Sequence, residues 1–242
     1  MPSREVTLEL PSVTLRAILR VPQDARGIVL FAHGSGSGRL SPRNNYVAEQ
    51  FARHAVATLL ADLLTAQEEE IDVLTARLRF DIALLTDRLL AVTTWVERHA
   101  QLHTLPIGYF GASTGAAAAL AAAARVPQIT AVVSRGGRPD LAAEALEQVR
   151  APTLLIVGGH DPEVLDLNRS ALARLRCEAE LEVVPGATHL FAEPGALEQV
   201  AGLAARWFEQ HFDAEAARRA AQRPGGSTES APETAGSPTH PP

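Results

Sequence analysis

The sequence of 242 residues contains no lysine, so all 22 of its basic residues are arginines. Schiff-base catalysis, serine–lysine dyads and the lysine-dependent phosphate loop each need a lysine amine, and the sequence excludes all three. Cys177 is the only cysteine. A single cysteine cannot form an internal disulfide or a cysteine-ligated zinc site, and this composition favours a reducing compartment.

Long apolar runs and basic clusters are also missing. The longest apolar run, residues 116–124, is about half as long as a membrane-spanning helix requires. The amino terminus lacks the apolar stretch of a signal peptide, and the net charge of −6 comes without a basic patch for nucleic acid. We expect a cytoplasmic protein that acts on a small molecule, with no membrane or nucleic acid as partner. The sequence leaves the oligomeric state open.

With 46% hydrophobic residues, the chain can bury one sizeable core. Residues 6–10 and 13–21 alternate at period two and predict an opening antiparallel pair. Short apolar runs then alternate with helical patterns, which predicts an α/β fold with a mostly parallel sheet and helices on both faces. The expected helices cover residues 44–54, 71–99, the Ala-rich run after 115, 141–149, 164–175 and 197–212.

The composition changes after residue 212, where Ala, Arg, Gly, Pro, Ser and Thr dominate. Such a segment buries too little apolar surface to offset the entropy of ordering it. We therefore predict one domain over residues 1–212 and a disordered tail over 213–242, which begins as a fraying helix.

The segment GYFGASTGAAAAL contains the pattern G-x-S-x-G, formed by Gly111, Ser113 and Gly115. Small residues on both sides suit a strained strand-to-helix turn that presents the serine as a nucleophile, as in α/β-hydrolases. The pattern alone fits a glycine turn that merely packs tightly equally well. Its context must therefore decide between the two.

A serine hydroxyl needs a base to activate it and an acid to orient that base. In the α/β-hydrolase fold the acid and then the histidine follow the serine, on loops after later strands. The run TLLIVGGHD places Asp161 just after one predicted strand, and LEVVPGATH places His189 after the next. Asp161, followed by Pro162, also fits the start of a helix, where an aspartate caps free amides.

Seven other histidines compete with His189, namely His33, His54, His99, His103, His160, His211 and His240. Most lie near helix ends, in the tail or away from the expected site. His33 precedes the serine, which is the wrong order for the base. His160 would occupy the loop of the acid and leave no separate acid to orient it. These positions favour Ser113, Asp161 and His189 as the catalytic set.

An oxyanion needs two preorganised backbone donors. The amide of Thr114 follows the nucleophile directly, and we assign the second donor to Ser35, with Gly36 as the neighbouring alternative, in LFAHGSGSGRLSPRNN. A flexible Gly/Ser connection is the other interpretation of that segment. The expected chemistry needs no cofactor and no metal.

Together, HGSGSGRLSPRN, GYFGASTGAAAAL, VVSRGGRPDLA, LLIVGGHD and PGATHLF resemble a dienelactone-hydrolase-like α/β hydrolase. The resemblance covers about residues 5–212. It is to the cap-free bacterial type that is sometimes joined to phosphoribosyltransferase domains, and we expect no such domain beyond residue 212. The resemblance implies an eight-stranded, mostly parallel sheet without a cap domain and an acyl-enzyme on Ser113. Dienelactone hydrolases proper place a cysteine there, so we do not expect activity on dienelactone itself.

The segment 134–150 is short where larger relatives insert a lid, and we expect an open cleft. Arg135 and Arg138, in SRGGRPD, leave the carboxyl end of a strand and are candidates to hold a substrate carboxylate. Pairing with a nearby acid such as Asp140 is the alternative. The acidic run 68–70 is a candidate for the opposite rim, or a solvated turn before a helix.

We therefore expect a serine hydrolase of the carboxylic ester type, which cleaves a small ester, lactone or thioester. The alternative is a non-catalytic module that keeps the fold and binds a partner. Nucleotide binding by the glycines of 108–115 is disfavoured, because their spacing does not match G-x-G-x-x-G.

Overall fold

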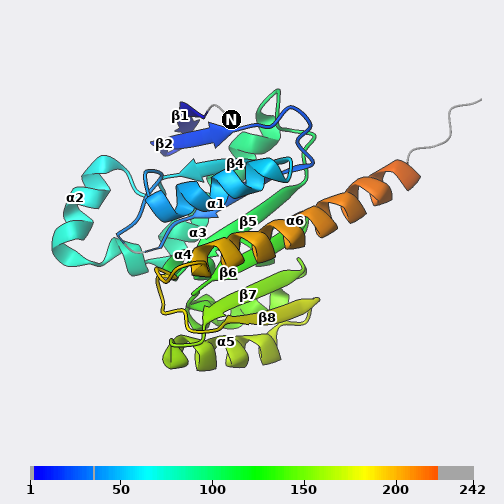
Figure 1. Ribbon diagram of the computed structural model, residues 1–242. Helices are drawn as coiled ribbons and strands as arrows, with labels where there is room; N and C mark the ends of the chain where they lie inside the picture. The colour runs from blue at the N-terminus through cyan, green and yellow to red at the C-terminus, as the bar shows by residue number, and fades with distance from the viewer. Residues whose placement is uncertain (1–2, 35, 223–242) are drawn as a thin grey trace, which may run out of the picture.

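The computed structural model describes residues 3–34 and 36–222, and in this part eight strands form one sheet in the order β1-β2-β4-β3-β5-β6-β7-β8 (Figure 1). The strands are β1 (Arg4–Leu10), β2 (Val13–Arg20), β3 (Gly27–Ala32), β4 (Val56–Ala61), β5 (Ile107–Ala112), β6 (Ala131–Arg135), β7 (Thr153–Gly158) and β8 (Ala179–Val184). Strand β2 runs antiparallel to β1 and β4, and the other neighbours are parallel. The predicted opening pair and mostly parallel sheet are confirmed.

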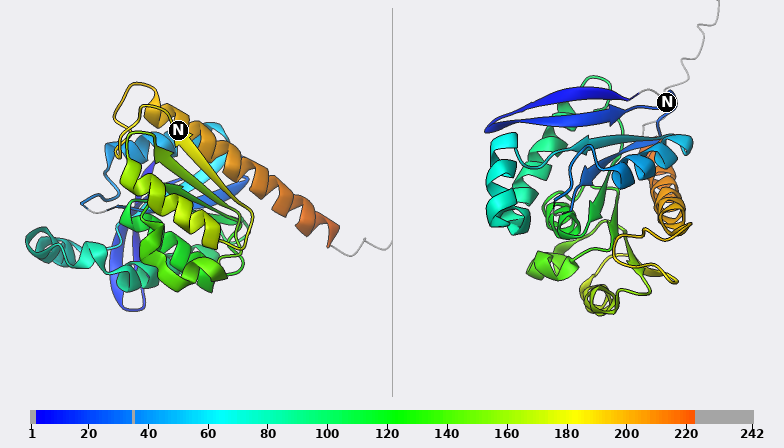
Figure 2. Two further views of the ribbon diagram at one scale, coloured as in Figure 1. Left: turned by 90° about the horizontal axis from the view of Figure 1, so that it is seen from below. Right: turned by 60° about the vertical axis from the view of Figure 1, so that its left-hand side comes forward.

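Helices cover both faces of the sheet, as expected (Figure 2). They are α1 (Pro42–Arg53), α2 (Ala66–Thr75), η1 (Leu78–Phe80), α3 (Ile82–Arg98), α4 (Thr114–Arg125), η2 (Pro139–Gln148), α5 (Pro162–Arg174) and α6 (Ala196–Ala221). Helices α1 and α6 pack on one face, and α3, α4, η2 and α5 pack on the other. Only the short η2 lies between β6 and β7, and no cap domain is present in the described residues.

The core has one apolar layer on each face of the sheet. Strands β3, β4, β5 and β7 are buried along their whole length, because parallel strands covered on both faces are apolar at nearly every position. Under α1 and α6, the rings of Phe31, Phe51, Phe110 and Phe208 pack with centroids 4.8–5.9 Å apart. This layer holds the ends of β3 and β5 in fixed positions.

The prediction of one long helix over residues 71–99 is wrong, because the structure divides this stretch into α2, η1 and α3. Helix α2 begins earlier, with a capping box between Thr65 and Glu68, and it ends at Ala76, which has a φ of 53°. Asp81 then caps α3 by accepting a hydrogen bond from the amide of Leu84. As a result, α2 and η1 extend outward from the body of the fold (Figure 1).

The last helix continues beyond residue 212, where the sequence predicts the domain to end. Residues 213–221 are therefore helical, and only 223–242 of the expected tail lie outside the described residues. Asp213 pairs with Arg26 at 2.6 Å, and Glu215 accepts from Arg218 and Arg219, so charged pairs support a stretch with little apolar burial. Of the described helices, none has the length and apolar character needed to cross a bilayer.

The layer under α6 makes a testable contribution to stability. Phe208 is 0% exposed, and Phe208→Ala should lower the free energy of unfolding by about 3–5 kcal/mol, because a cavity remains in the core. Phe80 is 53% exposed, and Phe80→Ala should change it by less than about 0.5 kcal/mol. Urea unfolding measures both. Equal losses in the two variants would contradict this description of the core.

Candidate active site

The backbone at Ser113, between β5 and α4, is strained. Its φ of 51° and ψ of −122° are rare for a residue with a side chain and cost about 1–3 kcal/mol. A side-chain carbon on Gly111 would overlap the backbone of Ala116, and one on Gly115 would overlap the carbonyl oxygens at the end of β3. The glycines of the G-x-S-x-G pattern are therefore required by close packing.

The loop of residues 135–138, after β6, contacts both the turn at Ser113 and His189. The amide of Ser113 donates to the carbonyl of Arg135 at 3.2 Å, and the amide of Arg138 donates to the carbonyl of Ser113 at 3.1 Å. A side-chain carbon on Gly136 would lie 3.6 Å from Cε1 of His189. Ser113 and His189 thus border the same short loop.

Asp161 and His189 form a hydrogen bond, with 2.7 Å between Oδ2 and Nδ1. Asp161 lies at the start of α5 but makes no capping hydrogen bond with its side chain, so its carboxylate is used for His189 instead. With a carboxylate at Nδ1, that nitrogen carries the proton and Nε2 is the acceptor. In this structure the hydrogen bond of the His189 ring is to Asp161, and none joins it to the Ser113 hydroxyl.

Residues 33–38, which we call the glycine loop, pass close to the turn at Ser113. A side-chain carbon on Gly34 would lie 2.9 Å from the carbonyl oxygen of Ala112 and 3.1 Å from Cβ of Ser113. Ser35, the predicted second oxyanion donor, lies outside the described residues. Thr114 is the first residue of α4, so its amide has no acceptor within the helix.

The residues that follow the glycine loop are held by an acid that comes directly after β4. Asp62 accepts from the amide of Arg39 at 2.6 Å and pairs with its guanidinium at 2.5 Å. Asn45, on α1, donates to the carbonyls of Arg39 and Ser41. These contacts hold residues 39–41, which follow the glycine loop.

His33, at the start of the glycine loop, is buried and forms a hydrogen bond with a residue of α1. Its Nδ1 lies 2.7 Å from Nδ2 of Asn44. Burial lowers the pKa of His33 to about 4, with the charge of Arg135 as a smaller cause, so the ring is neutral at pH 7. His33 is therefore a structural neighbour of the site.

The two candidate substrate arginines have different surroundings. Arg138 forms two hydrogen bonds with Asp140, at 2.8 and 2.9 Å, which is the alternative pairing that the sequence suggested. Arg135 is only 9% exposed, and its guanidinium lies 6.0 Å from the centroid of the Phe110 ring. Neither arginine lines the cavity between residues 33–38, Thr114 and α2.

A cavity of about 170 Å³ lies between the glycine loop, Thr114 and α2. Of the predicted acidic rim, Glu69 lines this cavity, whereas Glu68 pairs with Arg88 at 2.7 Å. The other charged groups in its wall are Asp62, Asp72 and Arg79.

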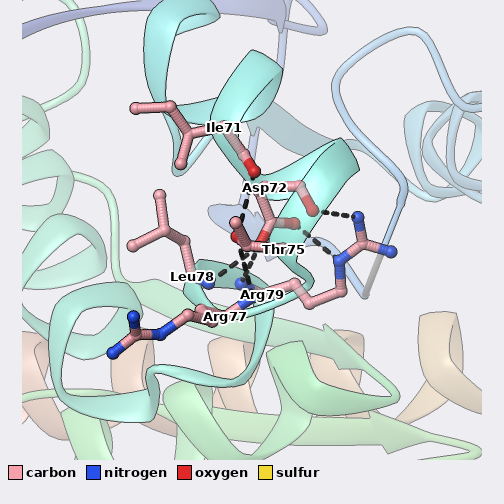
Figure 3. Close-up of polar contacts among 6 residues, drawn as sticks. All are labelled: Ile71, Asp72, Thr75, Arg77, Leu78 and Arg79. Atoms are coloured by element: carbon pink, nitrogen blue, oxygen red, sulfur yellow. Dashed lines mark hydrogen bonds and ion pairs between the residues drawn. The ribbon is translucent and has the colours of Figure 1, made fainter.

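Asp72 and Arg79 hold the outer wall of the cavity together (Figure 3). Asp72 is 3% exposed, and its carboxylate accepts from the amides of Leu78 and Arg79 and from Nε of Arg79 at 2.6 Å. These hydrogen bonds lower the pKa of Asp72 against the effect of burial. Sequence reasoning missed this pair, because the left-handed turn at Ala76 that brings the two residues together has no glycine to mark it.

The parallel sheet, the strained serine turn and the acid–histidine pair at the ends of later strands define an α/β hydrolase. Residues 15–224 match the model of the dienelactone hydrolase family, and the chain belongs to this family of hydrolases. The resemblance stated from the sequence motifs is thereby confirmed.

Two proteins from strains of Mycobacterium tuberculosis, each named as a predicted phosphoribosyl transferase, are 56% identical over 210 residues. The match covers 86% of this chain and 46% of each relative, so the chain spans about half of their length. The crystal structure of dienelactone hydrolase from Anabaena variabilis is 54% identical, with a TM-score of 0.85 over 87% of this chain and 98% of that one. An esterase domain from Rhodothermus marinus, 18% identical, shares the fold with a TM-score of 0.68 over 88% of this chain and 100% of that domain.

The glycines around Ser113 give a prediction about stability. Gly115→Ala should lower the free energy of unfolding by about 3 kcal/mol, because the new carbon meets backbone oxygens that cannot move aside. Gly202→Ala is the matched control inside α6, where the nearest atom is the flexible end of Arg206 at 3.4 Å. It should raise the free energy of unfolding by up to about 1 kcal/mol. Urea unfolding of both variants measures the difference, and a tolerated Gly115→Ala would refute the close packing.

The buried His33 predicts a pH dependence of stability. Its pKa is about 4 in the folded protein and about 6.5 in the unfolded chain, so the unfolded chain binds more protons between these values. The contribution of His33 to the free energy of unfolding is fully present above about pH 6.5. It decreases by about 3 kcal/mol as the pH falls from about 6.5 to about 4. In His33→Gln this part of the slope should be absent. Unfolding measured from pH 4 to 7 tests this, and equal slopes in both proteins would contradict it.

Proposed function

We propose that this protein hydrolyses a small ester, lactone or thioester through an acyl-enzyme formed on Ser113. The observation that carries the proposal is the 2.7 Å hydrogen bond between Asp161 and His189. It lies beside residues 135–138, which are hydrogen-bonded to the backbone of Ser113. Asp161 orients the imidazole and stabilises it when it becomes charged. Membership in a hydrolase family supports the general reaction.

In the first half of the reaction, Nε2 of His189 accepts the proton of the Ser113 hydroxyl while Oγ attacks the substrate carbonyl carbon. The carbonyl oxygen takes the negative charge of the tetrahedral intermediate. When the bond to the leaving group breaks, His189 returns the proton to the leaving oxygen or sulfur. The acyl group remains on Oγ as an ester.

In the second half, His189 accepts a proton from water, and the hydroxide attacks the acyl carbon. Collapse of the second intermediate breaks the bond to Oγ, which regains the proton from His189. The product is a carboxylic acid, and Ser113 is regenerated.

The oxyanion is bound by two backbone amides in this proposal. Thr114 supplies one, at the amino terminus of α4, where the helix dipole also favours negative charge. Ser35 supplies the other from the glycine loop. The contact of Gly34 with Ala112 and Ser113 supports this, because it brings the loop within reach of the nucleophile.

The cavity beside Thr114 receives a small substituent of the substrate. Its volume of about 170 Å³ is below the range of roughly 300–1,000 Å³ for pockets that bind drug-sized ligands. Leu63, Leu85 and Val73 give it apolar walls beside the charged groups. We therefore favour short acyl or alkoxy groups over long chains.

Replacement of Ser113 tests the mechanism directly. Ser113→Ala should abolish labelling by a fluorophosphonate probe and lower the hydrolysis of short p-nitrophenyl esters by about a thousandfold or more, because the nucleophile is gone. Ser170→Ala removes an exposed hydroxyl on α5 and should change neither readout. Unchanged labelling of Ser113→Ala would refute the proposal.

Two other functions deserve comparison. A non-catalytic binding module would leave the folded wild-type protein unreactive toward the probe, and it gives no reason for the hydrogen-bonded Asp161 and His189 next to a strained serine. The name of the Mycobacterium tuberculosis relatives suggests phosphoribosyl transfer, but this chain matches only 46% of their length. We place acyl hydrolysis in the shared part.

A further inference from the structure

Arg135 is a buried cation without an acidic partner among the described residues. It is 9% exposed, and its Nη1 is buried with no hydrogen-bond partner. No ion pair of the described residues includes Arg135 or Arg43, a cation whose charge acts on Arg135. Because burying an unpaired charge costs free energy, the buried guanidinium of Arg135 requires an explanation.

The backbone of Arg135 is hydrogen-bonded to the turn at Ser113. In the sheet register Arg135 is the neighbour of Ala112, the residue before the nucleophile, and its carbonyl accepts the amide of Ser113. Its side chain lies on the α1 face, where its guanidinium carbon is 6.0 Å from the centroid of the Phe110 ring. His33, the first residue of the glycine loop, follows β3 and borders the same space.

Arg135 remains charged under the conditions of the reaction. Burial, followed by the nearby charge of Arg43, lowers the pKa of Arg135 to about 10, so the guanidinium is protonated at neutral pH. The ring of His33 is neutral and therefore does not repel the positive charge of Arg135. Arg135 therefore keeps an uncompensated positive charge near His33, the first residue of the glycine loop, and Arg43 adds a second.

We propose that Arg135 is a positioning residue whose fixed positive charge, behind the glycine loop, stabilises the oxyanion that forms on the substrate carbonyl. The proposal rests on the acyl-enzyme mechanism above. Arg135 does not touch the substrate in it. A preorganised charge that is itself buried stabilises the charged transition state more than the neutral ground state, so it increases kcat and has little effect on KM.

The decisive experiment compares Arg135→Gln, Arg135→Lys and the wild type on short p-nitrophenyl esters with and without a free carboxylate. Arg135→Gln should lower kcat by about 10- to 100-fold and change KM by less than about threefold on both kinds of ester. Arg135→Lys keeps a charge and should recover most of the loss at neutral pH. Arg26→Gln is the control for removing an arginine elsewhere in the fold, since Arg26 pairs with Asp213 of α6 at 2.6 Å, and its kcat should stay within about twofold.

The lysine variant adds a readout that a purely structural role would not change. Because the natural chain has no lysine, residue 135 would carry its only lysine amine, and burial beside Arg43 would lower the pKa of that amine. The kcat of Arg135→Lys should therefore fall at alkaline pH, where the wild type keeps its charge. This measurement stands even if Arg135→Gln does not fold.

Three results would overturn the inference. They are an unchanged kcat in Arg135→Gln, an effect on KM confined to the carboxylate-bearing esters, which would make Arg135 a substrate anchor, and a kcat of Arg135→Lys that follows the wild type at every pH. A wild-type protein that neither reacts with the fluorophosphonate probe nor hydrolyses any ester would instead refute the proposed function itself.

Discussion

The strained backbone at Ser113 is the constraint on which the candidate site depends. A residue with a side chain adopts a φ of 51° only if its surroundings hold it there, and here two hydrogen bonds to residues 135–138 and close packing at Gly111 and Gly115 do so. The same contacts set the distance between β3, β5 and β6. The site and the centre of the sheet are therefore stabilised by one set of interactions, and the glycines serve both.

Much of this arrangement follows from the sequence, because parallel strands end at one edge of the sheet. The apolar runs before Ser113, Asp161 and His189 are visible as strands, and their order predicts that the three residues gather at that edge. The structure brings Asp161 and His189 into contact there. Their catalytic roles remain predictions, as does that of Thr114.

Other features have no local signal in the sequence. The contact between Asp72 and Arg79 depends on a left-handed alanine at the end of α2, a conformation for which glycine is the usual marker. The charge of Arg43 that acts on the buried Arg135 comes from α1, which lies about ninety residues earlier in the chain. The extension of α6 beyond residue 212 rests on charged pairs such as Arg26 and Asp213, which composition alone does not show.

The attachment of α2 has a consequence for motion. Asp72 is the only buried residue of that helix, while Val73 and Leu74 are 71% and 87% exposed. Segments with so few buried contacts open at a small fraction of the free energy of global unfolding. We therefore expect the outer wall of the cavity to exchange its amide hydrogens independently of the sheet, so that the cavity changes shape while Ser113, Asp161 and His189 stay in place.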